Sequence, residues 1–77
     1  MDLEILGEII REIRQKNTKL SQEELADAIG LERTYISKIE SGKKNITIET
    51  LGLICKGLGI AVSDFFLLYD KRVGTKW

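Results

Sequence analysis

Two amphipathic segments between residues 21 and 41 are joined by only Gly30 and Leu31, and this short connection constrains the fold more than any other feature. Helices joined by two residues cannot lie antiparallel, so they must cross at a steep angle. Ser21 and Glu24 have the spacing of a capping box, which predicts that the first of these helices starts here. Gly30 ends it, since glycine adopts left-handed backbone at no steric cost. The sequence therefore predicts two short, steeply crossed helices.

Apolar residues recur at helical spacing in the rest of the chain as well, and no segment shows the alternation of a strand. The first three expected helices cover about residues 3–17, Ser21 to Gly30, and about 32–41. Thr47 is expected to cap a fourth helix that Gly57 and Gly59 close, and Ser63 is expected to cap a short last helix. Asp70 to Trp77 are expected to form a loose tail. The predicted fold class is all-α with five helices.

Composition limits the classes of function. A chain of 77 residues forms one small domain, and extra support from disulfides, metals or oligomerisation is common at this size. Cys55 is the only cysteine and there is no histidine, so neither an intramolecular disulfide nor a zinc site is expected, and self-association remains. The chain has no apolar run as long as a membrane span and no signal segment, so we expect a cytoplasmic protein without a membrane partner. No cofactor and no small-molecule substrate are implied.

The crossed pair carries a specific residue pattern. Counting from Gln22, Ala26 is fifth, where only a small side chain lets the helices cross closely, and Gly30 is ninth, in the turn. The remaining diagnostic positions are apolar and expected to be buried: Leu25, Ile29, Leu31, Ile36 and Ile39. This pattern is typical of a helix-turn-helix.

These residues resemble the Cro/C1-type (XRE) helix-turn-helix family, from about Ile10 to Phe66. Within that family, the segment LERTYISKIESGKKNIT is most similar to controller proteins of restriction–modification systems, which are small dimeric autoregulators. The resemblance implies a single lambda-repressor-like DNA-binding domain over residues 1–77, with the helix-turn-helix at about 21–41 and a dimerisation region at about 46–69. One departure is that the link from Arg14 to Gln22 is one residue longer than the common family spacing.

Charge is unevenly distributed although the net charge is zero. Residues 20–32 contain only acidic charges, whereas Arg33 to Asn45 are mainly basic, so one short segment has a local phosphate-binding character. On the third helix, the side opposite Ile36 and Ile39 is expected to enter the major groove of double-stranded DNA. The candidate base-contacting residues are Arg33, Thr34, Ser37 and Lys38. A solvated arginine beside Glu32 is the alternative for Arg33.

A second set of residues is expected to contact the DNA backbone: Gln22, Tyr35, Ser41, Lys43, Lys44 and Asn45. The family resemblance implies the contact by Gln22, which could otherwise be a plain helix-start residue. Tyr35 could be partly core, and the loop from Lys43 could be merely solvated. The resemblance also implies an ion pair between Arg14 and Glu40, for which two separate surface charges are the alternative.

An excess of apolar residues in the C-terminal half suggests a dimer interface, because more of them are present than short helices can bury. The candidates are Ile46, Ile48, Leu53, Phe65, Phe66, Leu67 and Leu68. Some of these could instead close the core over Trp77 or Leu3. A twofold dimer would place two reading helices about 34 Å apart, which predicts a (pseudo)palindromic operator.

The leading hypothesis is a homodimeric, sequence-specific transcriptional regulator, most similar to a restriction–modification controller protein. A phage-type repressor or an antitoxin regulator is an alternative within the family, and a protein-interaction module that does not bind DNA is an alternative outside it. An enzyme is not expected. The chain has no histidine and no glycine-rich phosphate loop, Cys55 lies on a core face, and Ser21 is explained as a cap.

Overall fold

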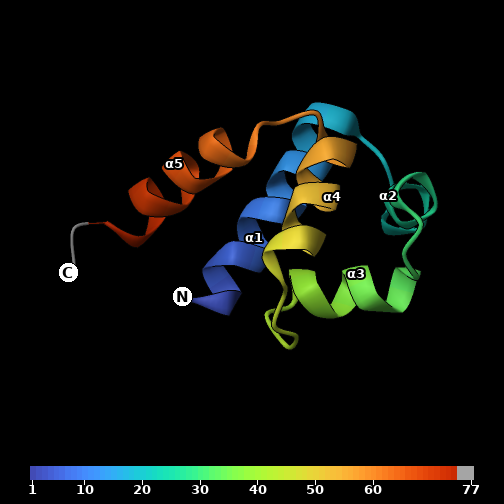
Figure 1. The fold of residues 1–77 in the computed structure, drawn as a ribbon, viewed down its shortest axis with the longest axis horizontal. Helices are drawn as coiled ribbons and strands as arrows, with labels where there is room; N and C mark the ends of the chain where they lie inside the picture. The colour runs from blue at the N-terminus through green and yellow to red at the C-terminus, as the bar shows by residue number, and fades with distance from the viewer. Residues whose placement is uncertain (75–77) are drawn as a thin grey trace.

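The computed structural model describes residues 1–74 and contains five α-helices and one π-helical turn (Figure 1). They are α1 (Leu3–Ile13), the π turn (Arg14–Thr18), α2 (Gln22–Ile29), α3 (Arg33–Glu40), α4 (Ile48–Leu58) and α5 (Val62–Val73). None of the described residues lies in a strand, so the predicted all-α fold is confirmed. Helices α2 and α3 pack against each other, α1 packs against α3, and α4 packs against α2, while α5 packs against α1 and α4 and extends to the side of the molecule opposite α2.

The first predicted helix is present as α1 followed by the π turn. Asp2 caps α1, since its carboxylate accepts the backbone N–H groups of Glu4 and Ile5. At the other end the N–H of Lys19 donates to the carbonyl of Arg14 at 2.8 Å, which closes a loop one residue longer than an α-helical turn. This wider turn lies in the link from Arg14 to Gln22.

The start and end predicted for the first helix of the crossed pair, Ser21 and Gly30, are confirmed. Ser21 accepts the backbone N–H of Glu24 at 3.0 Å, and the Glu24 carboxylate accepts that of Ser21 at 2.9 Å, which completes the capping box. Gly30 has a φ of +73°, the left-handed conformation that was expected of it. The next residue, Leu31, returns a hydrogen bond to the carbonyl of Ala26. Two residues thus suffice to turn the chain into α3.

A glycine that the sequence analysis did not single out decides how closely α1 approaches α3. A Cβ atom on Gly7 would overlap the carbonyl oxygen of Ile39 and lie 2.7 Å from that of Glu40. Only a residue without a side chain permits this approach. The available signal was an isolated glycine inside a helical pattern, which often has a packing reason.

One core joins all five helices. Its buried apolar residues are Leu6, Ile9, Ile10, Ile13, Leu25, Ala26, Ile36, Ile39, Leu51, Ile54, Cys55, Leu58, Phe65 and Tyr69. Leu25, Ile36, Ile39 and Cys55 were expected to be buried and are among them, whereas Ile29 and Leu31 are only partly buried against this core.

Three expectations about the C-terminal half were wrong. Gly57 does not close α4 but lies within it, where a Cβ atom would meet the side chains of Leu25 and Ile29; Gly59, with φ +72°, ends the helix. Ser63 does not cap α5, which starts after Ala61 without a side-chain cap. Asp70 to Val73 are helical rather than a loose tail, whereas Trp77 lies outside the described residues.

Across the part of the chain that the structure describes, no single helix is long and apolar enough to span a membrane. Only α4 and α5 taken together reach that length and composition, and they are bent by 99° relative to each other.

Candidate nucleic-acid interface

Helix α3 presents its four predicted base-contacting residues away from the core. Ile36 and Ile39 are buried, whereas Arg33, Thr34 and Lys38 are exposed and Ser37 is partly exposed. The ion pairs among residues 1–74 involve Arg14 and Arg72 but not Arg33, so Glu32 does not hold that guanidinium. The outer face of α3 is therefore open to a ligand.

The loop after α3 is held close to the same helix. The N–H of Lys43 donates to the carbonyl of Lys38 at 2.9 Å, and the Ser41 hydroxyl donates to the same carbonyl at 3.1 Å. Lys44 places its Nζ atom 5.4 Å from the centre of the Tyr35 ring, a cation–π contact. Tyr35 is partly buried, as one of its two interpretations required. This part of the loop is thus attached to α3.

Asn45 continues the same loop as an exposed residue. Its side-chain oxygen accepts the backbone N–H of Ile46 at 2.9 Å. The side-chain NH2 of Asn45 makes no hydrogen bond to any of the residues that the structure describes.

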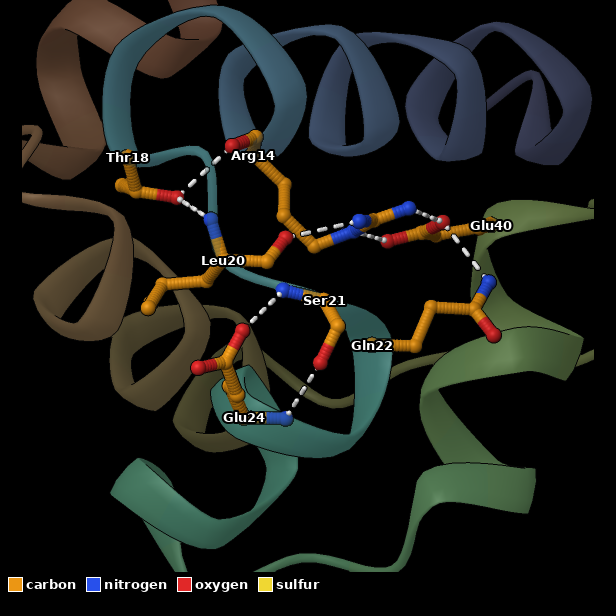
Figure 2. A network of polar contacts seen from close by, with 7 residues as sticks. All are labelled: Arg14, Thr18, Leu20, Ser21, Gln22, Glu24 and Glu40. Carbon is orange, nitrogen blue, oxygen red and sulfur yellow. Dashed lines mark hydrogen bonds and ion pairs between the residues drawn. The ribbon is translucent and has the colours of Figure 1, made fainter.

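Arg14 and Glu40 form the ion pair that the family resemblance implied (Figure 2). Arg14 Nε donates to Glu40 Oε2 at 2.7 Å and Arg14 Nη2 donates to Oε1 at 2.9 Å, a bidentate arrangement. Arg14 Nη1 reaches the carbonyl of Leu20 at 2.8 Å. The side chains are only 8% and 2% exposed. The pair thus joins the end of α1, the linker before α2 and the end of α3.

The electrostatic setting favours the charged form of Arg14. The hydrogen bonds that it donates to Glu40 and the negative charge of that carboxylate outweigh burial and raise the pKa of Arg14. Elsewhere, burial raises the pKa of the Cys55 thiol, which suits a core residue rather than a nucleophile. No group of residues able to hold a metal ion occurs in residues 1–74.

Gln22 is tied to the same ion pair, which sequence reasoning did not anticipate. Its side-chain Nε2 donates to Glu40 Oε1 at 3.0 Å, and the residue is only partly buried (Figure 2). The two residues are 18 positions apart, so nothing local in the sequence indicates the contact.

The predicted dimer residues differ in their exposure. Ile48, Leu53, Leu67 and Leu68 are exposed, and Ile46 and Phe66 are partly buried against the core. Phe65 was wrongly placed among them, because its side chain is 0% exposed and belongs to the core. Leu3 is partly exposed and is not a core residue.

Comparison with known proteins agrees with this geometry. A family model described as helix-turn-helix matches residues 10–65, and the chain belongs to that family. It is 44% identical over 66 residues to the control protein C.MunI from Mycoplasma sp, covering 86% of this chain and 89% of that one. It is 46% identical over 63 residues to the control protein C.SmaI from Serratia marcescens, covering 80% and 74%. The predicted resemblance to controller proteins is thereby confirmed.

Solved structures give the same result. The wild-type restriction–modification controller protein C.Esp1396I is similar with a TM-score of 0.85 and 39% identity, over 92% of this chain and 91% of that one. Another structure shows the C.Esp1396I tetramer in complex with its natural 35 base-pair operator, again with a TM-score of 0.85.

Proposed function

We propose that this chain is a sequence-specific DNA-binding transcriptional regulator, a restriction–modification controller protein that binds a (pseudo)palindromic operator as a homodimer. The observation that carries the proposal is the outer face of α3, whose polar and basic side chains are exposed on a helix-turn-helix with a fully packed inner face. A structural neighbour at 39% identity is bound to its operator as a tetramer, which supports the same function here.

The proposal assigns base reading to Arg33, Thr34, Ser37 and Lys38. An arginine can bridge O6 and N7 of a guanine, and such a bidentate contact discriminates against other bases by about 1–3 kcal/mol. The methyl group of Thr34 can contact that of a thymine. Arg33 is the residue with the largest expected contribution, because its guanidinium is exposed and is not engaged by Glu32.

Contacts to the DNA backbone are assigned to Gln22, Tyr35, Ser41, Lys43, Lys44 and Asn45. They position the reading helix but do not read the sequence. Lys43 and Lys44 follow α3 directly, and the hydrogen bond from Lys43 to Lys38 keeps the loop beside it. The two lysines supply the positive charge that a chain of zero net charge needs near phosphates.

The dimer is assigned to the exposed apolar residues of α4 and α5, with Ile46 and Phe66 at their margin. Leu53, Leu67 and Leu68 are large apolar side chains on the surface of a small domain, and exposed apolar patches commonly mark interfaces. On this proposal the chain acts in the cytoplasm, where its DNA partner lies, and no catalytic reaction is assigned to it.

The test begins with selection of bound duplexes from a random DNA pool, followed by footprinting of the selected site. We expect two half-sites about one helical turn apart. Arg33→Ala should weaken binding to that site by about 1–3 kcal/mol and relax specificity at one base pair. Arg33→Lys is the matched control, since it keeps the charge but loses the bidentate fork, so it should lose specificity and retain binding to random DNA.

Binding that is insensitive to DNA sequence, or unchanged by Arg33→Ala, would contradict this function. A second candidate, an interaction module that does not bind DNA, is favoured by the zero net charge and by the exposed acidic residues of α2: Glu23, Glu24 and Asp27. A salt titration separates the two, since each neutralised phosphate contributes a slope of about −0.9 to log K against log salt. Within the family, a neighbouring restriction endonuclease gene would distinguish a controller protein from a phage-type repressor or an antitoxin.

A further inference from the structure

Glu40 receives three side-chain hydrogen bonds and not merely the two of its ion pair. Arg14 donates to both carboxylate oxygens, and Gln22 Nε2 donates to Oε1 (Figure 2). A carboxylate can only accept, so the NH2 end of the Gln22 amide must face it and the carbonyl end must face away. The orientation of the Gln22 side chain is therefore determined by Glu40.

This contact restricts a side chain that would otherwise be mobile. Gln22 is the first residue of α2 and is only partly buried, and a glutamine in such a position ordinarily samples several rotamers. Glu40 is itself fixed, because its side chain is 2% exposed and bidentate to Arg14. The amide nitrogen has two hydrogens, of which Glu40 takes one. The second hydrogen remains available for another acceptor, and the contact with Glu40 has already oriented its amide before DNA binds.

We infer that Glu40 is a positioning residue for DNA: it holds the Gln22 amide so that the second N–H donates to a backbone phosphate. The inference rests on the proposed function and adds to it a role for the buried ion pair. Arg14 fixes Glu40, Glu40 orients Gln22, and Gln22 contacts the phosphate. A preorganised donor loses less conformational entropy on binding than a mobile one, so the anchoring contributes to affinity.

A double-mutant cycle tests the coupling, with the highest-affinity selected duplex as the probe. Gln22→Ala should weaken binding roughly tenfold, the effect of one hydrogen bond to a charged group. Arg14→Met/Glu40→Met removes both charges together, an exchange that folded proteins often tolerate. In that background Gln22→Ala should change affinity by no more than about twofold, the usual limit of additivity error.

A phosphate scan gives a readout that a purely structural role would not move. Methylphosphonates are placed one at a time along the duplex, which removes a charged acceptor at each position. At one position, the methylphosphonate should weaken DNA binding by the wild-type chain and leave binding by Gln22→Ala unchanged. The salt dependence of Gln22→Ala should equal that of the wild type, because a neutral amide releases no counterion.

A matched pair of variants keeps the test decisive if the double methionine variant does not fold. Glu40→Gln and Arg14→Lys both weaken the ion pair. Arg14→Lys leaves the carboxylate beside Gln22 and should keep the methylphosphonate signature. Glu40→Gln offers one acceptor oxygen instead of two, and Arg14 competes for it, so the signature should be lost.

The outcomes distinguish a failure of the proposed function from a failure of the positioning role of Glu40. A wild-type chain that binds no selected duplex better than random DNA overturns the proposed function and this inference with it. A wild-type chain that binds its selected site, with equal effects of Gln22→Ala in both backgrounds, overturns the positioning role of Glu40 alone. If Arg14→Lys loses the methylphosphonate signature as completely as Glu40→Gln does, the positioning role of Glu40 is also overturned. The loss would then reflect a weakened ion pair and a less stable fold, not the missing acceptor beside Gln22.

Discussion

Helix α1 and the turn that follows it make two bidentate arginine–glutamate pairs, one toward α3 and one toward α5, and the two differ in burial. The Arg14 and Glu40 side chains are 8% and 2% exposed, whereas those of Arg72 and Glu12 are 39% and 41% exposed. The distances are similar, since both Arg72–Glu12 contacts measure 2.9 Å. The difference shows that geometry alone does not give the energetic role of an ion pair. Loss of one partner lowers the free energy of unfolding strongly where water cannot solvate the remaining charge, and only slightly where water can solvate that charge.

The two sides of the molecule are accordingly held in different ways. On the α3 side, a desolvated polar network fixes three segments, and Gly7 allows the backbones to approach closely. On the α5 side, Phe65 and Tyr69 are buried in the core, and the Tyr69 hydroxyl accepts the N–H of Asp2 at 2.6 Å. The side proposed to read DNA is thus held by a buried polar network, whereas on the side proposed to dimerise the buried contacts are mainly apolar and the bidentate ion pair is exposed.

The largest effect is expected from Arg14→Met. It leaves the Glu40 carboxylate buried without its ionic partner and with only the hydrogen bond from Gln22, which should lower the free energy of unfolding by about 3–5 kcal/mol. Urea unfolding followed by circular dichroism measures the change. Arg14→Met/Glu40→Met should recover much of the loss, and a single variant as stable as the wild type would show that water reaches the pair.

Gly7→Ala comes next. Its new methyl group would overlap the Ile39 carbonyl and force α1 away from α3, with an expected loss of about 1–3 kcal/mol. Gly52→Ala is the matched control, since Gly52 lies within α4 with no neighbouring atom within 4 Å of an added Cβ. That variant should be more stable by roughly 0.5–1 kcal/mol, because alanine is favoured over glycine in a helix. Equal effects of both substitutions would refute the packing role of Gly7.

Ser21→Ala is expected to have a smaller effect, about 1 kcal/mol, because it removes one half of the capping box of α2. Ser63→Ala serves as the comparison, since Ser63 lies inside the first turn of α5 and caps nothing. It should change the unfolding free energy by less than about 0.5 kcal/mol. A similar loss in both variants would mean that the helix boundaries were assigned incorrectly.

The smallest effect is expected from Arg72→Ala, which breaks the exposed pair. Its hydrogen bond and charge hold the pKa of Glu12 below the ordinary value. A lowered pKa in the folded state adds stability above the ordinary pKa, and this contribution is lost as the pH falls through the lowered value. The small difference between Arg72→Ala and wild type should therefore shrink as the pH falls below about 4.3, where the unfolded glutamate protonates, and vanish once the pH is below the lowered pKa of Glu12; high salt should also reduce it. A difference that grows in acid would contradict this account.

Features that depend on neighbouring residues along the chain could be predicted from the residue pattern alone. Helical periodicity, the Ser21–Glu24 capping box and the left-handed Gly30 are local features, so the order of the helices and the exposed face of α3 could be predicted from them. The same local rule failed in the last helix, where Phe65 to Leu68 form an unbroken apolar run. Such a run does not indicate which side chains point inward.

Only the tertiary structure decided that question, because burial depends on what packs against a helix. It placed Phe65 in the core and left Leu67 and Leu68 exposed. It extended α5 to Val73, where Arg72 reaches Glu12 from 60 positions away. It also brought Gln22 to Glu40 across 18 positions. Contacts between residues so distant in the chain depend on how the side chains meet where helices pack together, and the local pattern of neither partner specifies which side chains meet.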